Sequence, residues 1–526
     1  MGALTGETMC TRVINVLLAA ALLFSAGCSS RPPVWLDAAA AERGPALDAR
    51  IDRAPADGAG LDLPRSKVPW ATSAGGKQGW VEGHDVAVDR AGNAYVAGVF
   101  AGTVSFGATT LTAKGVEDLF VAKVSPAGAF LWAVRAGGSN AWMHEVGLAV
   151  DGGSNTYVTG VVEVQSTSST PVAFGTKVLT AQAKLLHRFV SKLSPAGAFL
   201  WAVQGELDSG SGPSESTGGN SIAVDSTGRV YIAGGYYYKA TYGSTVLLGK
   251  GKNIFVVSLS PSGAFLWAKT TTGANDTAGA NEEWASAIAA DGAGTVVITG
   301  LFGDQGWTTF GSTVLQPADT ANVFLARVSA AGSFSSATSP GSYPYSYLPH
   351  FPGLALDGAG NACLVGLFSK TATFGAASLS GGGVEAYLVK IDPQGATLWA
   401  LATTSALFNT VVLTDVAVDS TGACLATGVL WGTSAIGQQT LTSKGQSEVV
   451  VVKVSPSGKL VTAGSSASML TAAASGNAIA LDGSDHTWVV GSFEGSVTFG
   501  ATTLTSTSTL KPYRDLFIWR SPAQGL

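Results

Sequence analysis

The chain has 526 residues, of which 68 are glycine, and only 12% carry a charge. Hydrophobic residues make up 46%, enough for a large core, which excludes a disordered polar chain. The net charge of -5 excludes the broad positive surface that nucleic-acid binding needs, and four cysteines are too few for a disulfide scaffold of this size.

Residues 1–27 are predicted to be an export signal. An apolar run, residues 13–24, follows Arg12 and is too short to span a bilayer comfortably. The small residues that end in Cys28 resemble the lipobox of bacterial lipoproteins, which implies that the Cys28 thiol is lipidated and becomes the N-terminus. An ordinary secretory signal cut nearby is the alternative, and translation starts at Met1 or at Met9.

Residues 28–67 are rich in Pro, Ala, Arg and Asp without strand alternation, so they are expected to form a flexible tether. Acyl chains would hold the protein to a membrane without a transmembrane helix. Ser29, in place of Asp, resembles the outer-membrane sorting choice of lipoproteins. We therefore expect an exported protein, lipid-anchored to the outer membrane and either periplasmic or at the cell surface.

A unit of 62 to 74 residues is repeated seven times between residues 68 and 526. Its anchor is a short apolar strand that ends in Asp, and a Gly follows nine residues later in every unit. Units of this length suit four-stranded propeller blades. The Asp residues are Asp89, Asp151, Asp225, Asp291, Asp357, Asp419 and Asp482, and the Gly residues are Gly98, Gly160, Gly234, Gly300, Gly366, Gly428 and Gly491.

Turn chemistry predicts two hairpins in each unit. The Asp side chain can accept hydrogen bonds from backbone N–H groups two residues on, and a Gly such as Gly92 accepts a positive φ. A Ser-Pro-x-Gly turn, as at Ser125–Gly128, closes the second hairpin. An Ala two residues before each Asp, such as Ala87, places the first strand innermost, because only a small side chain fits where sheets converge.

The two ends of the repeat region are expected to complete one blade. The seventh unit stops after its turn at Ser521–Pro522 and lacks a last strand. Residues 68–76 resemble that missing strand, with Trp70 in the place of Trp132. The sequence therefore predicts an all-β fold, a seven-bladed β-propeller of four-stranded blades, whose last blade is closed by the N-terminal strand.

The unit resembles a known repeat. Asp-x-x-Gly-Asn-x-Tyr-Val-x-Gly is intact at Asp89–Gly98, followed by Phe-Gly-x-x-x-Leu-Thr at Phe106–Thr112 and Asp-x-Phe-Val at Asp118–Val121. These motifs resemble the SBBP-type β-propeller repeat of exported bacterial proteins over residues 68–526, although units four and six depart from them most. The resemblance implies a seven-bladed propeller and no shared catalytic motif.

No motif for catalysis, metal binding or cofactor binding stands out. The five histidines lack metal-ligand spacing, and neither C-x-x-C nor a G-x-S-x-G nucleophile elbow occurs. We therefore expect no metal, no cofactor and no nucleophilic hydrolysis. Two acids from distant loops could still form the carboxylate pair of an exported polysaccharide-active enzyme, a glycosidase or lyase. The candidates are Glu82, Glu145, Glu206, Glu282 and Glu283.

Two further residue sets are given structural roles. Cys363 and Cys424 lie in second strands of adjacent units, six and five residues after the Asp, so they face opposite sides of their sheets and are expected to be buried free thiols. A Lys or Arg recurs in the third strand, except at Ser258, and is expected to pair with the recurrent Asp. These basic residues are Lys123, Lys192, Arg327, Lys390, Lys453 and Arg520.

A ligand is expected on the face that carries the long connections between units. The residue one position before each apolar strand is mostly polar, and these residues are expected to form a ring around the propeller axis. Aromatic residues and amides suit a glycan or an extended peptide, although each Trp could instead plug a crevice between sheets. The function favoured is a non-catalytic cell-envelope lipoprotein that binds a protein or carbohydrate there. The ring residues are His84, Asn220, Ser286, Thr414 and Asn477, and the aromatic candidates are Trp142, Trp284 and Tyr345.

Overall fold

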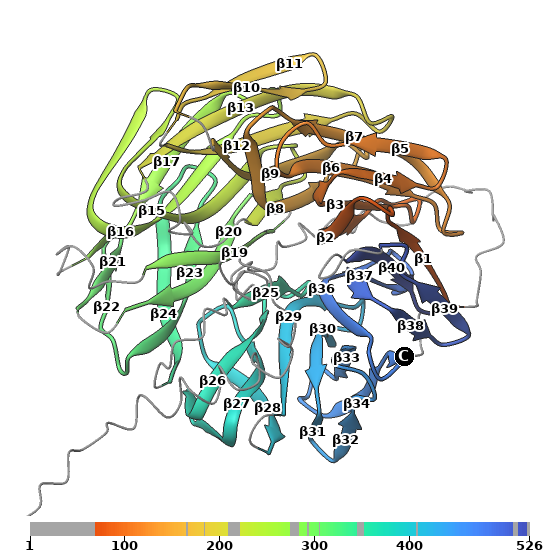
Figure 1. Ribbon diagram of the computed structural model, residues 1–526. Coiled ribbons are helices and arrows are strands. Elements are labelled where there is room, and N and C mark those ends of the chain that lie inside the picture. Colours follow the sequence, from red (N-terminus) through yellow and green to blue (C-terminus); the bar gives the residue numbers. More distant parts are fainter. Residues whose placement is uncertain are drawn as a thin grey trace, which may run out of the picture. The chain divides into compact units, whose positions relative to one another are not determined.

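The computed structural model describes residues 69–164, 167–183, 185–208, 221–273, 283–291, 294–303, 306–343, 352–406, 409–508 and 514–522. All of them belong to one compact unit, Arg43–Leu526. The predicted signal, the tether and Cys28 lie outside the described residues. Every helix or strand element in the described residues is a β-strand, which confirms the all-β class (Figure 1).

Most of the described strands fall into seven antiparallel sets of four, one set for each sequence unit. The first set has the order β2-β3-β6-β7. The first strands are β2 (Trp80–Val88), β8 (Ala141–Val150), β14 (Ser221–Val224), β19 (Trp284–Ala290), β25 (Gly353–Leu356), β29 (Thr410–Val418) and β36 (Ala473–Leu481). The second strands are β3 (Ala94–Ala101), β9 (Thr156–Val164), β15 (Val230–Tyr242), β20 (Val296–Phe302), β26 (Ala362–Phe374), β30 (Cys424–Trp431) and β37 (Thr487–Glu494).

The outer two strands of each set follow in the same order. The third strands are β6 (Asp118–Val124), β12 (Leu186–Leu193), β16 (Thr245–Leu259), β23 (Ala321–Val328), β27 (Ala377–Ile391), β33 (Glu448–Val454) and β40 (Asp515–Arg520). The fourth strands are β7 (Phe130–Gly137), β13 (Phe199–Asp208), β17 (Phe265–Thr270), β24 (Phe334–Tyr343), β28 (Thr397–Ser405), β34 (Leu460–Ser465) and β1 (Trp70–Ala74). The N-terminal strand thus stands in the seventh set.

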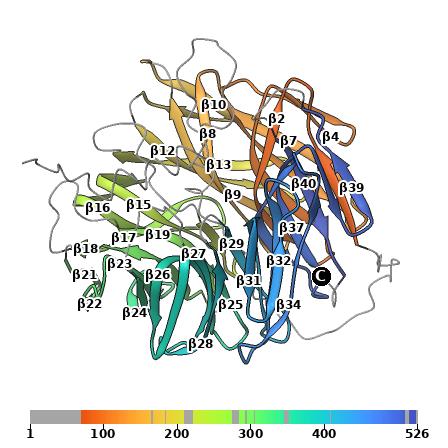
Figure 2. The same cartoon turned by 60° about the horizontal axis from the view of Figure 1, so that its bottom comes forward.

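The first strands are the innermost ones, as expected. They contact one another in the cyclic order β2, β8, β14, β19, β25, β29, β36 and back to β2. The recurrent Ala is buried in all seven, because neighbouring sheets pack against each other at this point. In both views the blue strands β37 and β40 lie near the orange strand β2, so early and late described strands lie side by side (Figure 1, Figure 2).

A hairpin arm between the second and third strands of each unit reaches back to the preceding unit. The arm β10–β11 pairs with β7, and Gly75, after β1, bridges Ser105 in β4. This pairing covers the outer sheet edge that would otherwise be open. The separate arms are β4 (Thr103–Phe106) with β5 (Thr109–Thr112), β10 (Thr170–Phe174) with β11 (Lys177–Ala181), β21 (Thr308–Phe310) with β22 (Thr313–Leu315), β31 (Thr433–Ile436) with β32 (Gln439–Thr442) and β38 (Ser496–Phe499) with β39 (Thr502–Thr505).

The other arms are continuous with longer strands. In units three and five the arm is the outer part of β15 and β16, or of β26 and β27, and it pairs with β13 or β24. In units four, six and seven the arm pairs with β18 (Thr272–Gly273), β28 and β35 (Ala467–Ser468) respectively. The described units are therefore joined at the outer edge as well as at the axis.

The N-terminal strand occupies the position that the sequence assigns to it. β1 pairs antiparallel with β40, and Ser73 lies opposite Phe517. The Trp70 Nε1–H donates to the Pro126 carbonyl at 3.0 Å, as Trp132 donates to Pro195 in the next unit. Gly128 and Gly197 lie under these two indoles, where a Cβ would come within 2.9 Å of the ring. The equivalent contacts identify β1 as a genuine fourth strand.

A β-bulge interrupts most innermost strands and explains the invariant Gly. In unit one the register shifts between Gly83 and Asp85, and in unit four between Ala285 and Ala287. The partner strand has Gly98 or Gly300 opposite the bulge, where an added Cβ would collide with the bulged backbone. A side chain at the Gly position would therefore push the two strands apart.

The expectation of free thiols is wrong, because Cys363 and Cys424 form a disulfide with a Cα–Cα distance of 6.2 Å. Both residues are fully buried in the core between units five and six. The two sheets pack face against face, so side chains on opposite sides of their own sheets point at each other. Opposite facing thus favours the bond between adjacent units, where it would prevent one within a single sheet.

Reduction of this disulfide should destabilise the protein. The bond joins residues 61 positions apart, so its loss is expected to lower the free energy of unfolding by about 2–4 kcal/mol. Urea unfolding of protein with the bond intact or reduced measures the difference. A Cys363→Ala/Cys424→Ala variant is the control, since its midpoint should not respond to reductant. Equal midpoints for the two wild-type samples would contradict the bond.

Candidate functional site

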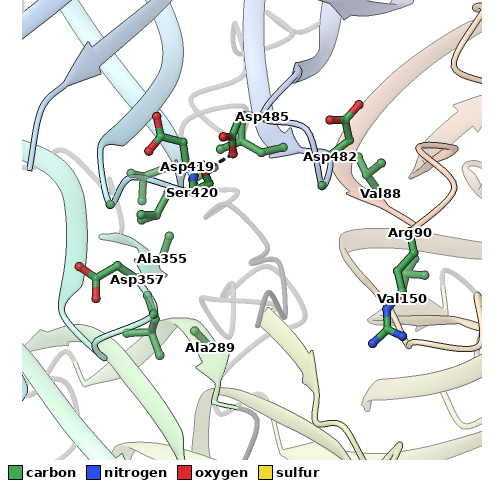
Figure 3. Close-up of a pocket in the computed structure, with 18 of the residues that line it drawn as sticks. Val88, Arg90, Val150, Ala289, Ala355, Asp357, Asp419, Ser420, Asp482 and Asp485 are labelled. Atoms are coloured by element: carbon green, nitrogen blue, oxygen red, sulfur yellow. Dashed lines mark hydrogen bonds between the residues drawn. The ribbon is translucent and has the colours of Figure 1, made fainter. Parts of the chain in front are cut away.

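A cavity of about 590 Å³ lies where the innermost strands end, and it is the candidate site (Figure 3). All seven innermost strands contribute to its wall, so it lies on the axis that they surround. It opens among the turns between first and second strands, at the end opposite the long connections on which the sequence placed the ligand. The apolar wall includes Val88, Val150, Val224, Ala289, Leu356, Val418 and Leu481.

The recurrent Asp residues stand at the rim and close their own turns. Asp89 accepts backbone N–H groups from Ala91 at 3.0 Å and Asn93 at 2.9 Å, as the sequence predicts for this turn. The Tyr95 hydroxyl donates to the second carboxylate oxygen at 3.2 Å. In Figure 3 the side chains of Asp357 and Asp419 point away from the centre of the cavity. These carboxylates therefore organise the rim more than they face its interior.

Third-strand cations pair with the rim carboxylates, which confirms the sequence prediction in five units. Arg327 instead donates to the carbonyls of Gly360 and Pro393 in the next unit. Ser258, the exception, is fully buried. The five nitrogen–oxygen distances are 3.3 Å for Lys123–Asp89, 3.9 Å for Lys192–Asp151, 2.7 Å for Lys390–Asp357, 2.9 Å for Lys453–Asp419 and 3.0 Å for Arg520–Asp482.

These contacts keep three rim carboxylates ionised. Burial alone raises the pKa of Asp357, but hydrogen bonds from Lys390 and Asn361 outweigh it and hold the pKa below its usual value. The pKa values of Asp419 and Asp482 are also lowered against burial, by hydrogen bonds from Thr421 and then Lys453 in the first case, and from Arg520 and then His486 in the second. An acid whose pKa is depressed is a poor proton donor at neutral pH.

Two further polar residues line the mouth. Asp485 stands at the turn position where several other units have Gly, with φ +59°, and accepts the Ser420 N–H of the preceding unit at 2.8 Å (Figure 3). Asp tolerates this left-handed conformation better than most residues. Arg90 lies beside Gly152 of the second unit. The rim therefore combines carboxylates and cations, with no single charge sign.

The polar ring predicted to bind ligand lies at the bulges and makes hydrogen bonds between units. Asn477 Nδ2 donates to the Gly83 carbonyl at 2.8 Å, and Thr414 Oγ1 donates to the Gly476 carbonyl at 2.8 Å. Ser286 is fully buried and donates to the Pro352 carbonyl. His84 Nδ1 accepts the Val146 N–H at 3.5 Å. Asn220 lies outside the described residues.

The aromatic candidates have different environments. Trp284 is 3% exposed, and the Lys252 ammonium lies 3.8 Å from its ring centroid, so it fills a crevice between units. Trp142 is half-buried and packs against His144 with ring centroids 5.1 Å apart. Tyr345 lies outside the described residues. The described part of this face thus offers Trp142 as its accessible aromatic candidate.

Each candidate acid that the structure describes bonds to a different partner. Glu82 accepts from Asn477 at 3.4 Å and Glu206 from Gln182 at 3.1 Å. Glu283 accepts from the hydroxyls of Thr271 and Thr308, while Glu145 lies 3.7 Å from Arg188. Glu282 lies outside the described residues. Within the described chain, no cluster of three or more His, Cys, Asp or Glu side chains could hold a metal ion.

A second repeated set was given no role by the sequence analysis, although its member Asp118 stands in the Asp-x-Phe-Val motif. In each third strand a buried polar side chain stands two residues before a Phe or Tyr, or before Val450 in unit six. In several units this side chain bonds the loop before the strand. Asn322 Oδ1, for instance, accepts the N–H groups of Ala318 at 2.8 Å and Asp319 at 3.1 Å. Alignment of the units on the third-strand aromatic would have shown it. The set is Asp118, His187, Asn253, Asn322, Glu385, Glu448 and Asp515.

Comparisons with known proteins give distant likenesses. No family model matches the chain. Over 175 residues it is 27% identical to an uncharacterized WD repeat-containing protein of Acanthamoeba polyphaga mimivirus, a match that covers 31% of this chain and only 12% of that protein's length.

Solved structures overlap weakly. A polysaccharide lyase, Uly1, gives a TM-score of 0.39 at 7% identity and covers 84% of this chain and 89% of its own. A xylan β-1,4-xylosidase of Bacillus halodurans gives 0.28 at 10%, covering 85% and 96%. A gluconolactonase of Xanthomonas campestris gives 0.28 at 14%, covering 64% and 81%. At these scores none of the overlaps bears on function.

Removing one lysine that pairs with a rim carboxylate tests whether these pairs stabilise the rim. Lys390→Met should lower the free energy of unfolding by about 2–3 kcal/mol, because it leaves a buried carboxylate with fewer partners. The pKa of Asp357 should rise, so the stability that its ionisation supplies above the ordinary Asp pKa is diminished. Thermal unfolding between pH 3 and 7 measures both effects.

The matched control is Lys123→Met. The Lys123 pair is longer, at 3.3 Å, and its lysine side chain is 12% exposed against 3% for Lys390, so a smaller loss is expected. Equal and negligible losses in the two variants would show that the pairs do not support the rim.

Proposed function

We propose that this chain is a closed seven-bladed β-propeller that serves as a non-catalytic binding protein of the cell envelope. The cyclic contacts of the innermost strands support the blade count. The pairing of β1 with β40 supports closure by the N-terminal strand. The likeness of the unit to the SBBP-type repeat belongs to the same proposal, as does a domain division into signal, tether and propeller.

Export of the protein is proposed from two independent features. The apolar run before Cys28 resembles a lipoprotein signal. The buried Cys363–Cys424 disulfide suits an oxidising compartment, since disulfides persist outside the cytosol and are rare within it. Acyl chains on Cys28 would anchor the protein to the outer membrane. No helix able to cross a bilayer is found in the residues that the structure describes.

The observation that carries the binding function is the axial cavity. Its wall is apolar, its mouth carries hydroxyls, carboxylates and an arginine, and backbone turns surround it. Ligand sites commonly combine an apolar wall with a few fixed polar groups. The rim carboxylates are engaged by their own turns and by lysine or arginine, which supports binding over acid catalysis. We propose an extended peptide of a protein partner or a glycan as the ligand.

An exported polysaccharide-active enzyme is the second candidate, favoured by one cluster. Burial raises the pKa of Glu163, as a general acid requires, and its carboxylate lies 4.0 Å from His144 Nε2. Glu145, next to His144, has a left-handed backbone with φ +55°, and such strain is frequent at functional sites. Substrate cleavage would therefore be assigned to this cluster and not to the axial cavity.

Blocking the cavity mouth tests the binding function. Gly358 and Gly483 line the mouth, have ordinary negative-φ backbone, and have no atom within 4 Å of an added Cβ, so Trp is accommodated there without a backbone clash. Gly358→Trp and Gly483→Trp should each weaken binding at least about tenfold on glycan and peptide arrays probed with the full chain, because the indole fills the entrance.

Gly464→Trp is the matched control, since Gly464 in β34 is equally unobstructed but does not line the cavity. A turnover assay on the bound glycans accompanies the arrays. Binding without turnover supports the proposal, whereas cleavage would favour the enzyme. Binding that both mouth variants retain would place the ligand elsewhere.

A further inference from the structure

The buried polar position of the third strand carries an acid in four units: Asp118, Glu385, Glu448 and Asp515. A buried carboxylate is costly unless both oxygens receive hydrogen bonds or a cation. The four units can therefore be compared by the hydrogen bonds or cation that each one provides to its buried carboxylate. The seventh unit matters most, because there the acid lies where β1 closes the ring.

Three of the four acids have donors on both oxygens. Asp118 receives the N–H groups of Lys114 and Gly115 and, at 2.7 Å, the Arg135 guanidinium. Glu385 receives the Ser405 N–H on one oxygen and the Thr403 hydroxyl on the other, each at 2.9 Å.

Glu448 is satisfied in the same manner. The Lys444 N–H donates to its Oε1 at 2.9 Å, and the Ser465 hydroxyl donates to its Oε2 at 2.8 Å. Each of these three units thus balances the buried charge with neighbouring groups.

Asp515 differs from the other three. Its Oδ2 accepts the Thr507 N–H at 2.6 Å and the Thr507 hydroxyl at 2.9 Å. Its Oδ1 is buried and has no hydrogen-bond donor among the residues that the structure describes, and the whole residue is 1% exposed. The described residues therefore supply donors to only one oxygen of the ionised side chain.

The closing strand lacks the cation that unit one provides. Arg135 lies opposite Phe120 in the β6–β7 pair, and the corresponding residue opposite Phe517 in the β40–β1 pair is Ser73. Gly75 packs directly on the Asp515 carboxylate, as Gly137 packs on Asp118. The two joints share their backbone arrangement. They differ because β7 supplies a cation, Arg135, where β1 has the neutral Ser73.

We propose that the joint between β1 and β40 is a pH-sensitive closure, in which protonation of Asp515 tightens the pairing of the N-terminal strand and ionisation loosens it. The neutral acid avoids an incompletely satisfied buried charge. Only this unit draws its fourth strand from the far end of the chain, so opening it does not require unfolding of the neighbouring units.

The groups around Asp515 are consistent with this behaviour. The loop after β39 presents the hydroxyls of Ser506 and Thr507, β1 leads into Gly75, and β37 places Phe493 opposite. Burial raises the pKa of Asp515 above its usual value, against the two hydrogen bonds from Thr507, and no neighbouring charge contributes to the shift.

The nearest charged residues on these strands stand one position along from Asp515 or from its partner, and so on the other face of the sheet. Arg514 and Glu494 are chain neighbours of Asp515 and Phe493, and successive strand residues point to opposite faces. Lys77, two residues after Gly75, is exposed. Because the folded pKa exceeds the unfolded one, the joint is most stable at low pH and loses stability as pH rises through the folded pKa.

Hydrogen exchange on the full chain tests the closure. After correction for intrinsic exchange, amides of β1 and β40 should be less protected at pH 7.5 than at pH 4, by a factor of about ten for each unit by which folding raises the Asp515 pKa. Asp515→Asn should remove this dependence. The β6–β7 joint of the same molecule, with its Asp118–Arg135 pair, is the internal control and should not show it.

A second variant places in β1 an arginine equivalent to the one that pairs with the buried acid of unit one. Ser73→Arg should pair with Asp515, protect β1 at pH 7.5 and abolish the pH dependence, whereas Ser73→Gln, similar in reach but neutral, should retain it. Equal protection of β1 at both pH values in the wild type would overturn the proposal. So would a dependence that survives unchanged in Asp515→Asn.

Discussion

Crowding of the innermost strands around one axis is the constraint on which the rest of the structure depends. The strands contact one another cyclically, and only the recurrent alanine fits between the converging sheets. At the bulges, polar groups such as Thr414 and Asn477 bond to the next unit's backbone. Asp415 adds a carboxylate that accepts the Ile479 N–H of the following unit at 2.8 Å. The axis is therefore held by hydrogen bonds as well as by packing.

This arrangement decides where function can lie. Each innermost strand ends in an Asp-centred turn, so the turns of all units meet at one mouth and leave a cavity between them. The same carboxylates that form this rim are tied to their own turns, to tyrosines and to third-strand cations. A surface whose charges are committed in this way is rigid, which reduces the entropy lost when a ligand binds. This rigidity is the reason for proposing ligand binding, and not proton transfer, as the function.

Local chemistry made much of the fold predictable. The Asp turn, the Ser-Pro-x-Gly turn and the pairing of the basic third-strand residue depend on neighbours within one unit. The turns were found as expected, and the pairing was found in five units, Arg327 being the exception. The pairing of β1 with β40 was predictable because Trp70 repeats the setting of Trp132. These features require only the unit's own pattern.

What the sequence did not predict depends on relations between units. The Cys363–Cys424 bond could not be predicted from alternation within a single strand, because facing sheets bring opposite sides together. The polar ring stays a predicted ligand surface. Its hydrogen bonds to neighbouring units, such as the one from Ser286 to the Pro352 carbonyl, depend on which residues meet across units and were not predicted. The cavity at the turn end follows from convergence of the innermost strands, a property of the ring that we propose.

Closure of that ring by a strand from the opposite terminus is the central claim, and strand complementation tests it directly. The thermal unfolding midpoint of a chain that begins at Gly76 is measured with and without a synthetic peptide of residues 68–75. The account predicts a lowered midpoint that the peptide raises again, and a peptide with Trp70→Ala should be less effective because it lacks the bond to Pro126. A truncated chain that unfolds at the same temperature as the full protein would contradict closure by β1.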